Sequence, residues 1–389
     1  MKLFITGIGV VSAIGNDVTE SLSSLLNDKH GIKWSEDHNM MLGQVSLTND
    51  ELVSKLELTG QKISRTVLLG LVAAKEAWGN NKIDDSIKTG IISSTSVGGL
   101  DISEYYFKKY KQDQKADYSK FMVQENGKTT EEIAEILGIK GYINTLSTAC
   151  SSGANAILLG ARLIRSGRLD RVLVGGIDPI AEHNLKGFSA LNIVDNELCK
   201  PFDLNRKGLN LGEGAGFLLI ESEKSIERSK NAILCELSGW NNASDNYHQT
   251  ASSPDGKGAT LTMENALKVS NLSAEEISYV NVHGTGTINN DESEAQALKN
   301  VFTNKVPPFS STKTFTGHTL AASGAIEAVF SVLTITEQFM PNNLRFEQES
   351  AQSGLIPLQQ MKHTEVKHVI SNSFGFGGNC SSLIFSKID

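Results

Sequence analysis

Short apolar, β-branched runs alternate along the chain with segments whose apolar residues recur at helical spacing. The runs predict strands at residues 3–11, 90–95, 142–147, 171–176, 216–222, 232–240, 279–284, 307–312, 368–375 and 381–387. The helical spacing predicts helices at residues 64–78, 128–138, 153–167, 260–270 and 324–338. Continuously apolar strands separated by helices are typical of a sheet covered on both faces, so the chain is predicted to be an α/β protein.

Polar positions refine this pattern. Thr129 precedes Glu132 by three residues, the spacing of a capping box, and therefore predicts a helix start. Ser273 and Glu276 repeat the spacing. Two longer segments are polar and irregular, residues 35–58 and 101–127. We expect both to be insertions at the rim of the core.

One stretch of sequence occurs twice. Residues 150–164 and 321–335 align without gaps, and each follows a short apolar strand and opens a helix rich in small residues. The shared pairs are Ser152/Ser323, Gly153/Gly324 and Ala154/Ala325. Small residues let two helices pack closely at the centre of a molecule. We infer an internal duplication into two α/β halves, residues 1–240 and 241–389, each with a buried central helix.

Composition narrows the function classes. The 389 residues include 36 Lys plus Arg against 44 Asp plus Glu, a formal net charge of −8. Because nucleic-acid binding needs a clear cationic face, this balance argues against it. A local basic patch for an acidic partner stays compatible with it. No apolar run reaches the roughly 18 residues of a membrane-spanning helix, so no span is predicted.

The cysteines and the N-terminus indicate a compartment. Four scattered cysteines show no CxxC pairing, which predicts neither a zinc site nor a disulfide framework: Cys150, Cys199, Cys235 and Cys380. The run after Lys2 superficially resembles a signal peptide, but Gly7, Gly9 and Gly15 interrupt it. We expect a buried first strand that leads into a glycine turn, in a cytoplasmic protein.

Cys150 is the candidate nucleophile. It stands in STACSSG, directly after a predicted strand and directly before a predicted helix. Such a turn lifts a side chain out of the sheet, and the partial positive charge of a helix N-terminus lowers the pKa of a thiol. The alternative is an inert buried cysteine, and position alone does not separate the two.

Two histidines stand at the ends of apolar segments beside glycines. His283 lies in NVHGTGT, and His318 lies in TKTFTGHTLAASG, five residues after Lys313. Together with Cys150, they form a set that can deprotonate a nucleophile or polarise a carbonyl. Zinc binding is the rival interpretation, but the spacing lacks a short ligand pair.

Glycine-rich turns follow later strands. SFGFGGN at residues 373–379 exposes backbone N–H groups, which suits an oxyanion site, a phosphate site or a plain tight turn. Gly212, Gly214 and Gly216 in LGEGAG are interpreted as hairpin or strand-packing glycines without chemistry.

These motifs, taken in order, resemble the elongating β-ketoacyl-acyl-carrier-protein synthases with a Cys-His-His site. The blocks are STACSSG, LGEGAG, VHGTGT, SSTKTFTGHTLAASGAIEA and NSFGFGG, and the resemblance runs from TGIGVVSAIGN to SFGFGGN, essentially the whole chain. It implies the thiolase fold, with five αβαβα layers built from two duplicated halves.

The resemblance also implies a reaction, the decarboxylative Claisen condensation. Cys150 would carry an acyl thioester, and His283 and His318 would donate from Nε2 to the malonyl thioester carbonyl. The backbone N–H groups of Cys150 and Phe376 would hold the acyl oxyanion. Lys313 matches the active-site lysine of the family, and Glu327 matches its partner.

Further residues match the family less specifically. Phe376, between Gly375 and Gly377, matches a gating phenylalanine. Thr285 and Thr287 match threonines beside the phosphopantetheine arm. His248 and Thr250 match the border of the malonyl site. Four basic residues are candidates for contact with the acidic carrier protein or for a solvated surface: Lys62, Arg65, Arg206 and Lys207.

The family implies no metal and no organic cofactor beyond the phosphopantetheine of the acyl carrier protein. It implies a dimer, either a homodimer or a heterodimer with a chain-length-factor homologue. Asn379-Cys380 replaces the usual Thr-Asn after the glycine loop, and this puts a second sulfur near the predicted pocket. STACSSG is closer to polyketide-type synthases, which suggests a specialised pathway such as polyketide, aryl-polyene or pigment synthesis.

Two alternatives remain open. A non-catalytic, chain-length-factor-like subunit usually lacks the nucleophilic cysteine, so Cys150 argues against it. A thiolase acting on coenzyme A esters would use a second cysteine where this chain has two histidines. Starter-selective synthases use a histidine and an asparagine, and Lys313 with His318 disfavours them.

Overall fold

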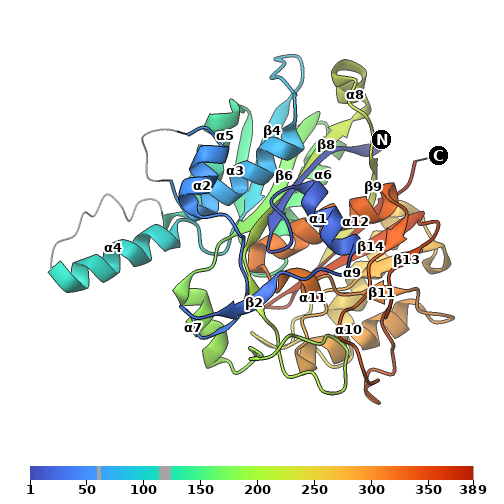
Figure 1. Cartoon of the computed structure of the whole chain (residues 1–389). Helices are drawn as coiled ribbons and strands as arrows, with labels where there is room; N and C mark the ends of the chain where they lie inside the picture. The colour runs from blue at the N-terminus through green and yellow to red at the C-terminus, as the bar shows by residue number, and fades with distance from the viewer. Residues whose placement is uncertain (59–62, 114–123, 389) are drawn as a thin grey trace.

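A ten-stranded mixed sheet runs through the whole molecule. The computed structural model describes residues 1–58, 63–113 and 124–388 (Figure 1). The first five strands are β5 (Tyr142–Leu146), β4 (Thr89–Ser94), β6 (Arg171–Asp178), β8 (Gly214–Ser222) and β1 (Leu3–Ser12). The sheet continues through β9 (Cys235–Ser244), β15 (Asn379–Ser386), β14 (His368–Gly375), β10 (Tyr279–Asn281) and β11 (Phe309–Ser310). All ten predicted strands are therefore present, although β10 and β11 are shorter than expected.

The two groups of five strands have the same topology. β5, β4 and β6 are parallel, and β8 and β1 follow them antiparallel. β11, β10 and β14 are likewise parallel, and β15 and β9 follow antiparallel. The groups meet where β1 pairs with β9 at Phe4–Glu236 and Ile5–Cys235. The duplicated α/β architecture is confirmed at the level of strand order. The predicted boundary at 240/241 was wrong, because it cuts β9, which belongs wholly to the second group, so the chain passes from one half to the other between Ser222 and Cys235.

Helices complete five layers. They are α3 (Arg65–Trp78), α5 (Asn126–Leu137), α6 (Ser152–Arg165), α9 (Lys257–Ser270), α10 (Ile288–Val301) and α12 (Ser323–Thr336). α3 packs on β1, β8 and β6, whereas α9 packs on β9 and β15. α6 and α12 contact each other and both groups of strands, so they form the central layer. This arrangement is the αβαβα thiolase fold that the sequence predicted.

Reciprocal glycines explain how the central helices approach. A Cβ atom on Gly153 would lie 2.7 Å from the backbone N of Ala325, and one on Gly324 would lie 2.8 Å from the backbone N of Ala154. Both distances are too short for any side chain. The small residues shared by the two copies therefore bring the helix starts into backbone contact.

The two polar segments contain more regular structure than their irregular sequence indicated. Residues 35–58 contain β3 (Met40–Gly43) and α2 (Asn49–Lys55), and the described part of 101–127 lies largely in α4 (Leu100–Asp113). Figure 1 shows α4 projecting from the body, which agrees with an insertion at the rim of the core.

One capping prediction was wrong and the other is confirmed. Thr129 lies inside α5, which begins at Asn126, and it is buried rather than capping. Ser273 forms a capping box with Glu276 at a short 3₁₀ turn.

Shorter elements connect the layers. They are α1 (Val18–Leu26), β2 (Ile32–Ser35), α7 (Glu182–Ala190), β7 (Leu211–Gly212), α8 (Glu223–Ser229), α11 (Lys313–Thr316), η3 (Leu320–Ala322), β12 (Phe339–Met340) and β13 (Lys362–His363). Across the described ranges, no helix has the length and apolar character needed to cross a bilayer.

Candidate active site

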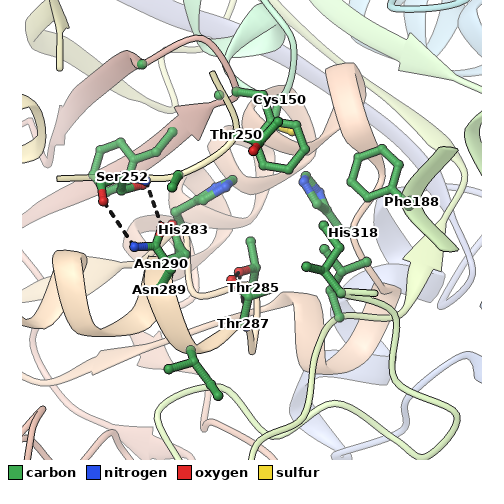
Figure 2. Close-up of a pocket in the computed structure, with 18 of the residues that line it drawn as sticks. Cys150, Phe188, Thr250, Ser252, His283, Thr285, Thr287, Asn289, Asn290 and His318 are labelled. Carbon is green, nitrogen blue, oxygen red and sulfur yellow. Dashed lines mark hydrogen bonds between the residues drawn. The ribbon is translucent and has the colours of Figure 1, made fainter. Parts of the chain in front are cut away.

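A cavity of about 300 Å³ brings together the three residues at the centre of the sequence prediction. Cys150, His283 and His318 all line it. They come from the turn before α6, the segment after β10 and the segment before α12. Figure 2 shows both imidazoles extending toward the side of the cavity where Cys150 lies. Residues up to 168 positions apart in the chain thus face one space.

The Cys150 turn is tight and internally bonded. Ala149 has a positive φ of 53°, which is unusual for a residue with a side chain. Ser152 Oγ donates to Ala149 O at 2.6 Å and accepts from the backbone N–H of Thr148 at 2.7 Å. Cys150 lies two residues before the first residue of α6. The structure therefore places the thiol at a strand-to-helix turn.

Burial dominates the ionisation of Cys150. It raises the pKa of the thiol to about 11, although the charge of Lys313 and the backbone N–H of Phe376 act in the opposite direction. The expectation of an acidified thiol was therefore wrong, because the low-dielectric surroundings outweigh the helix N-terminus. The thiol stays protonated near neutral pH.

Lys313 sets the proton position on His283. Its Nζ lies 3.3 Å from His283 Nδ1 and donates to the His283 carbonyl oxygen at 2.7 Å. An ammonium group has donors only, so Nδ1 must accept and Nε2 must carry the proton. Burial, with smaller contributions from Lys313 and His318, lowers the pKa of His283 well below its ordinary value. His283 is thus a neutral donor.

Glu327 compensates the charge of Lys313. Its Oε1 lies 2.5 Å from Lys313 Nζ, and both side chains are buried. Burial raises the pKa of Glu327 to about 7, and Lys313 opposes this rise. The pair is not part of the cavity lining, and it contacts His283 from behind. The ion pair therefore holds His283 in position without lining the cavity itself.

His318 is held by the chain on both sides. Its backbone N–H donates to Asn210 O at 2.7 Å, and its carbonyl accepts from Gly212 N at 2.9 Å. The two imidazole rings stand 5.4 Å apart at an interplanar angle of 86°. Burial and the charge of Lys313 lower the pKa of His318 well below its ordinary value. Both imidazoles are therefore neutral.

Glu294 is a buried residue that the sequence interpretation missed. Its carboxylate accepts from the backbone N–H groups of His283 at 2.9 Å and Gly284 at 2.8 Å. Burial raises its pKa to about 7. An acidic residue within the polar pattern of α10 gives no sequence signal that it points inward, so pattern alone could not have found it.

The glycine loop after β14 faces Cys150. The backbone N–H of Phe376 is directed at Cys150 and lowers its pKa. A Cβ atom on Gly375 would lie 2.7 Å from Thr148 O, and Gly377 has a φ of 84°. The Phe376 ring stacks on Phe188 of α7, with centroids 5.7 Å apart. Phe188 also lines the cavity, although no sequence motif singles it out.

Asn379 ties this loop to α6. Its Oδ1 accepts hydrogen bonds of 2.7 Å from Ser151, Asn155 and Asn242. Cys380 lines the cavity, as expected for the second sulfur. Where the family usually has Thr-Asn, this chain therefore has an asparagine whose side chain accepts three hydrogen bonds, followed by a cysteine in the cavity lining.

Three of the four other substrate-site candidates line the cavity, and the fourth does not. Thr250, Thr285 and Thr287 line the cavity, and the hydroxyls of Thr285 and Thr287 are 2.9 Å apart. His248 is exposed and is not part of the lining, but its Nδ1 accepts from the backbone N–H of Thr250 at 3.2 Å.

The candidate cations differ in their exposure. Lys207 is exposed, lines the cavity and lies 3.3 Å from a Glu197 oxygen. Arg206 is buried and bonded to Asp203 O and Glu292.

Arg65 makes a two-point ion pair with buried Glu213. Since their charges are neutralised inside the protein, Arg65 and Arg206 do not form the outward patch that was expected. Lys62 lies outside the described residues. A search of the described ranges finds no group of three or more His, Cys, Asp or Glu arranged to hold a metal ion.

Fold and site together define a thiolase-fold enzyme with a cysteine and two neutral histidines in one cavity. A family model described as the β-ketoacyl synthase N-terminal domain matches residues 2–225, and one described as its C-terminal domain matches residues 234–347. The chain therefore belongs to the β-ketoacyl synthase family and is an acyltransferase of the ketosynthase type.

Proteins with similar sequences match this chain over its full length. The 3-oxoacyl-[acyl-carrier-protein] synthase 2 of Staphylococcus aureus strain MRSA252 is 31% identical, covering 100% of this chain and 99% of its own. The protein of the same name from Vibrio harveyi is 29% identical over the same shares. Among solved structures, a ketosynthase from Xenorhabdus doucetiae in complex with its chain length factor is 31% identical. Its TM-score is 0.85, and the match covers 100% of this chain and 98% of that one.

A further structure, the ishigamide ketosynthase/chain length factor, has a TM-score of 0.93 at 24% identity, covering 100% and 99% of the two chains. This likeness supports the fold.

Proposed function

We propose that the chain is an elongating β-ketoacyl-acyl-carrier-protein synthase. It joins malonyl-carrier protein to an acyl group held on Cys150 by decarboxylative Claisen condensation, without a metal or organic cofactor. The observation that carries this proposal is the convergence of Cys150, His283 and His318 on one cavity. A nucleophile beside two neutral hydrogen-bond donors suits a reaction in which a thioester is attacked and an enolate must be stabilised.

In the first half-reaction, Cys150 sulfur attacks the carbonyl carbon of the acyl-carrier thioester. The new C–S bond forms as the bond to the carrier sulfur breaks, and the thiol proton leaves with the carrier thiol. The backbone N–H groups of Cys150 and Phe376 are suited to hold the tetrahedral oxyanion, because the Phe376 N–H is already directed at the sulfur.

In the second half-reaction, malonyl-carrier protein loses carbon dioxide. The electrons of the broken C–C bond pass into an enolate, whose oxygen accepts hydrogen bonds from Nε2 of His283 and His318. The enolate carbon then attacks the acyl thioester on Cys150, a C–C bond forms, and the thiolate departs and regains a proton. Neutral imidazoles with protonated Nε2 atoms supply this stabilisation without a strong base.

The remaining lining residues fit a long thioester arm. Thr250, Thr285 and Thr287 line the cavity, which supports contact of Thr285 and Thr287 with a phosphopantetheine arm and of Thr250 with the malonyl group. Lys207 is the exposed cation beside this cavity and is suited to contact an acidic carrier protein. Phe376, stacked on Phe188, is placed to control access to Cys150.

The pathway and the assembly are part of the same proposal. STACSSG and the likeness to a ketosynthase in complex with its chain length factor support polyketide or aryl-polyene elongation in the cytoplasm. β5 is an end strand of the sheet, and Tyr142 and Ile143 on it are each 38% exposed. An apolar end strand favours pairing with a second chain. That chain is an identical copy or a chain-length-factor homologue that completes the pocket.

Intact-mass spectrometry after mixing the enzyme with acyl-carrier protein tests the proposal. We expect acylation of Cys150, followed by a β-ketoacyl product and carbon dioxide when malonyl-carrier protein is added. Coenzyme A esters presented in parallel should load poorly. Efficient condensation of coenzyme A esters without decarboxylation would instead indicate a thiolase. If Cys150 is acylated neither when the chain is tested by itself nor when a chain-length-factor homologue is added, the chain is a non-catalytic subunit.

A further inference from the structure

His318 and His283 have different partners at Nδ1. His283 faces an ammonium, which can only donate. His318 faces a hydroxyl, because its Nδ1 lies 2.8 Å from Ser323 Oγ. A hydroxyl can donate or accept, so the proton position on His318 depends on the surroundings of Ser323.

Two features of those surroundings favour donation by Ser323. It is the first residue of α12, a helix of 14 residues, and is 1% exposed. A helix N-terminus carries a partial positive charge. This charge favours an unprotonated Nδ1 of His318, which faces it with a lone pair, and disfavours a protonated Nδ1, which would face it with an N–H group. Thr319 Oγ1 lies 3.2 Å from Ser323 Oγ and can donate to it, leaving the serine proton for His318.

Asn210 and Gly212 fix the backbone of His318, and the tautomer of the ring then decides what Nε2 presents to the cavity. If Nδ1 carried the proton, Nε2 would present a lone pair to the cavity and would repel a developing enolate oxygen. If Nε2 carries it, the ring donates as condensation requires.

We propose that Ser323 is a positioning residue that donates its hydroxyl proton to His318 Nδ1 and thereby keeps the proton of the neutral ring on Nε2. The inference rests on the proposed function only for its effect on rate. Ser323 does not touch the substrate; it acts through His318.

The first test separates the two half-reactions. Ser323→Ala should lower kcat for condensation about tenfold, the size expected when one hydrogen bond stops fixing the donor. Acylation of Cys150 should stay within about twofold of wild type, because that step uses other donors. Ser323→Thr keeps the hydroxyl and should restore most of the rate. Ser331→Ala is the matched control, since Ser331 is equally buried on α12 but donates to the backbone oxygen of Glu327.

The second test does not depend on activity. Nitrogen-15 spectra of histidine-labelled protein, with His318 assigned by loss of its signals in His318→Gln, report the tautomer directly. Wild type should show a protonated Nε2 and an unprotonated Nδ1, and Ser323→Ala should show a mixture. A protonated Nδ1 in wild type, or wild-type condensation by a folded Ser323→Ala, would overturn the role of Ser323. If the wild type performs no condensation, the proposed function fails, and the spectra alone decide what Ser323 does.

Discussion

The starts of α6 and α12 occupy equivalent places in the two halves, but their serine side chains have different hydrogen-bond partners. Each begins with Ser-Gly-Ala, and the glycines bring the two backbones into contact. In the first half, Ser152 bonds the backbone of the turn that carries Cys150. In the second half, Ser323 bonds the imidazole of His318. Duplication thus preserved the packing of the helix starts while the polar side chains took on separate tasks.

Burial acts on both helix starts but with opposite chemical consequences. It raises the pKa of the Cys150 thiol to about 11 and lowers the pKa of His318 well below its ordinary value. In both cases the neutral form is favoured. A neutral imidazole is what an enolate-stabilising donor requires, whereas a neutral thiol must lose its proton during acyl transfer. Under the proposed function, His318 therefore already has the protonation state that it needs, whereas Cys150 must still lose its proton when the acyl substrate reacts.

The largest effect is expected from removing the first-half nucleophile. Cys150→Ala should abolish acyl-enzyme formation and lower condensation by about a thousandfold or more. Decarboxylation of malonyl-carrier protein should persist, because its donors belong to the second half. Intact mass and carbon dioxide release measure the two activities. Cys235→Ala, at another buried cysteine, serves as the control, and unaltered condensation by Cys150→Ala would refute the division of labour.

The converse loss is expected from the second half. His283→Ala and His318→Ala each remove one donor to the enolate and should lower condensation and decarboxylation by about 10²–10³-fold. Cys150 should still be acylated, since the oxyanion donors of that step are backbone groups. Loading measured by intact mass checks this, with exposed His363→Ala as the control. Loss of loading in either variant would show that the halves do not act separately.

A smaller, structural effect is expected at Lys313. Lys313→Ala leaves Glu327 buried without its partner and should destabilise the fold by about 3–5 kcal/mol at pH 8. Burial raises the pKa of Glu327 and Lys313 opposes that rise, so in the variant this pKa should lie above its wild-type value of about 7. The buried carboxyl is protonated as the pH falls below its pKa, and the penalty should therefore be smaller at pH 5.5 than at pH 8. Urea unfolding at pH 8 and pH 5.5 measures this, with exposed Lys207→Ala as the control. Equal losses at both pH values would contradict the assignment.

The strongly patterned elements were predictable from sequence because their burial follows from local periodicity. α6 and α12 were expected at 153–167 and 324–338 and lie at Ser152–Arg165 and Ser323–Thr336. α4 was missed because its many charged and polar residues were interpreted as an irregular insertion, although Ile102, Tyr106 and Tyr110 recur at helical spacing.

The site was predictable where motifs name residues and was not where distant chain segments set their surroundings. Arg65 and Lys207 look alike in sequence, yet only Arg65 meets a buried carboxylate, that of Glu213, 148 residues away. Glu294 looks like a surface residue of a polar helix until the fold turns it toward His283. The helix start before Cys150 was readable locally, but the burial that outweighs it comes from the assembled fold.

The smallest effect concerns the ionisation of Cys150 and sharpens the comparison of the helix starts. With the pKa of its thiol near 11, the thiolate fraction and hence alkylation by iodoacetamide should rise about tenfold per pH unit between pH 7 and 10. Cys150 should still react faster than Cys199 and Cys235, because it lines the cavity and they do not. Peptide mass mapping after timed labelling measures each rate. If alkylation of Cys150 levels off below pH 8, the helix N-terminus rather than burial determines the pKa of the thiol. The comparison of the two helix starts would then fail, because burial would no longer favour the neutral form at both.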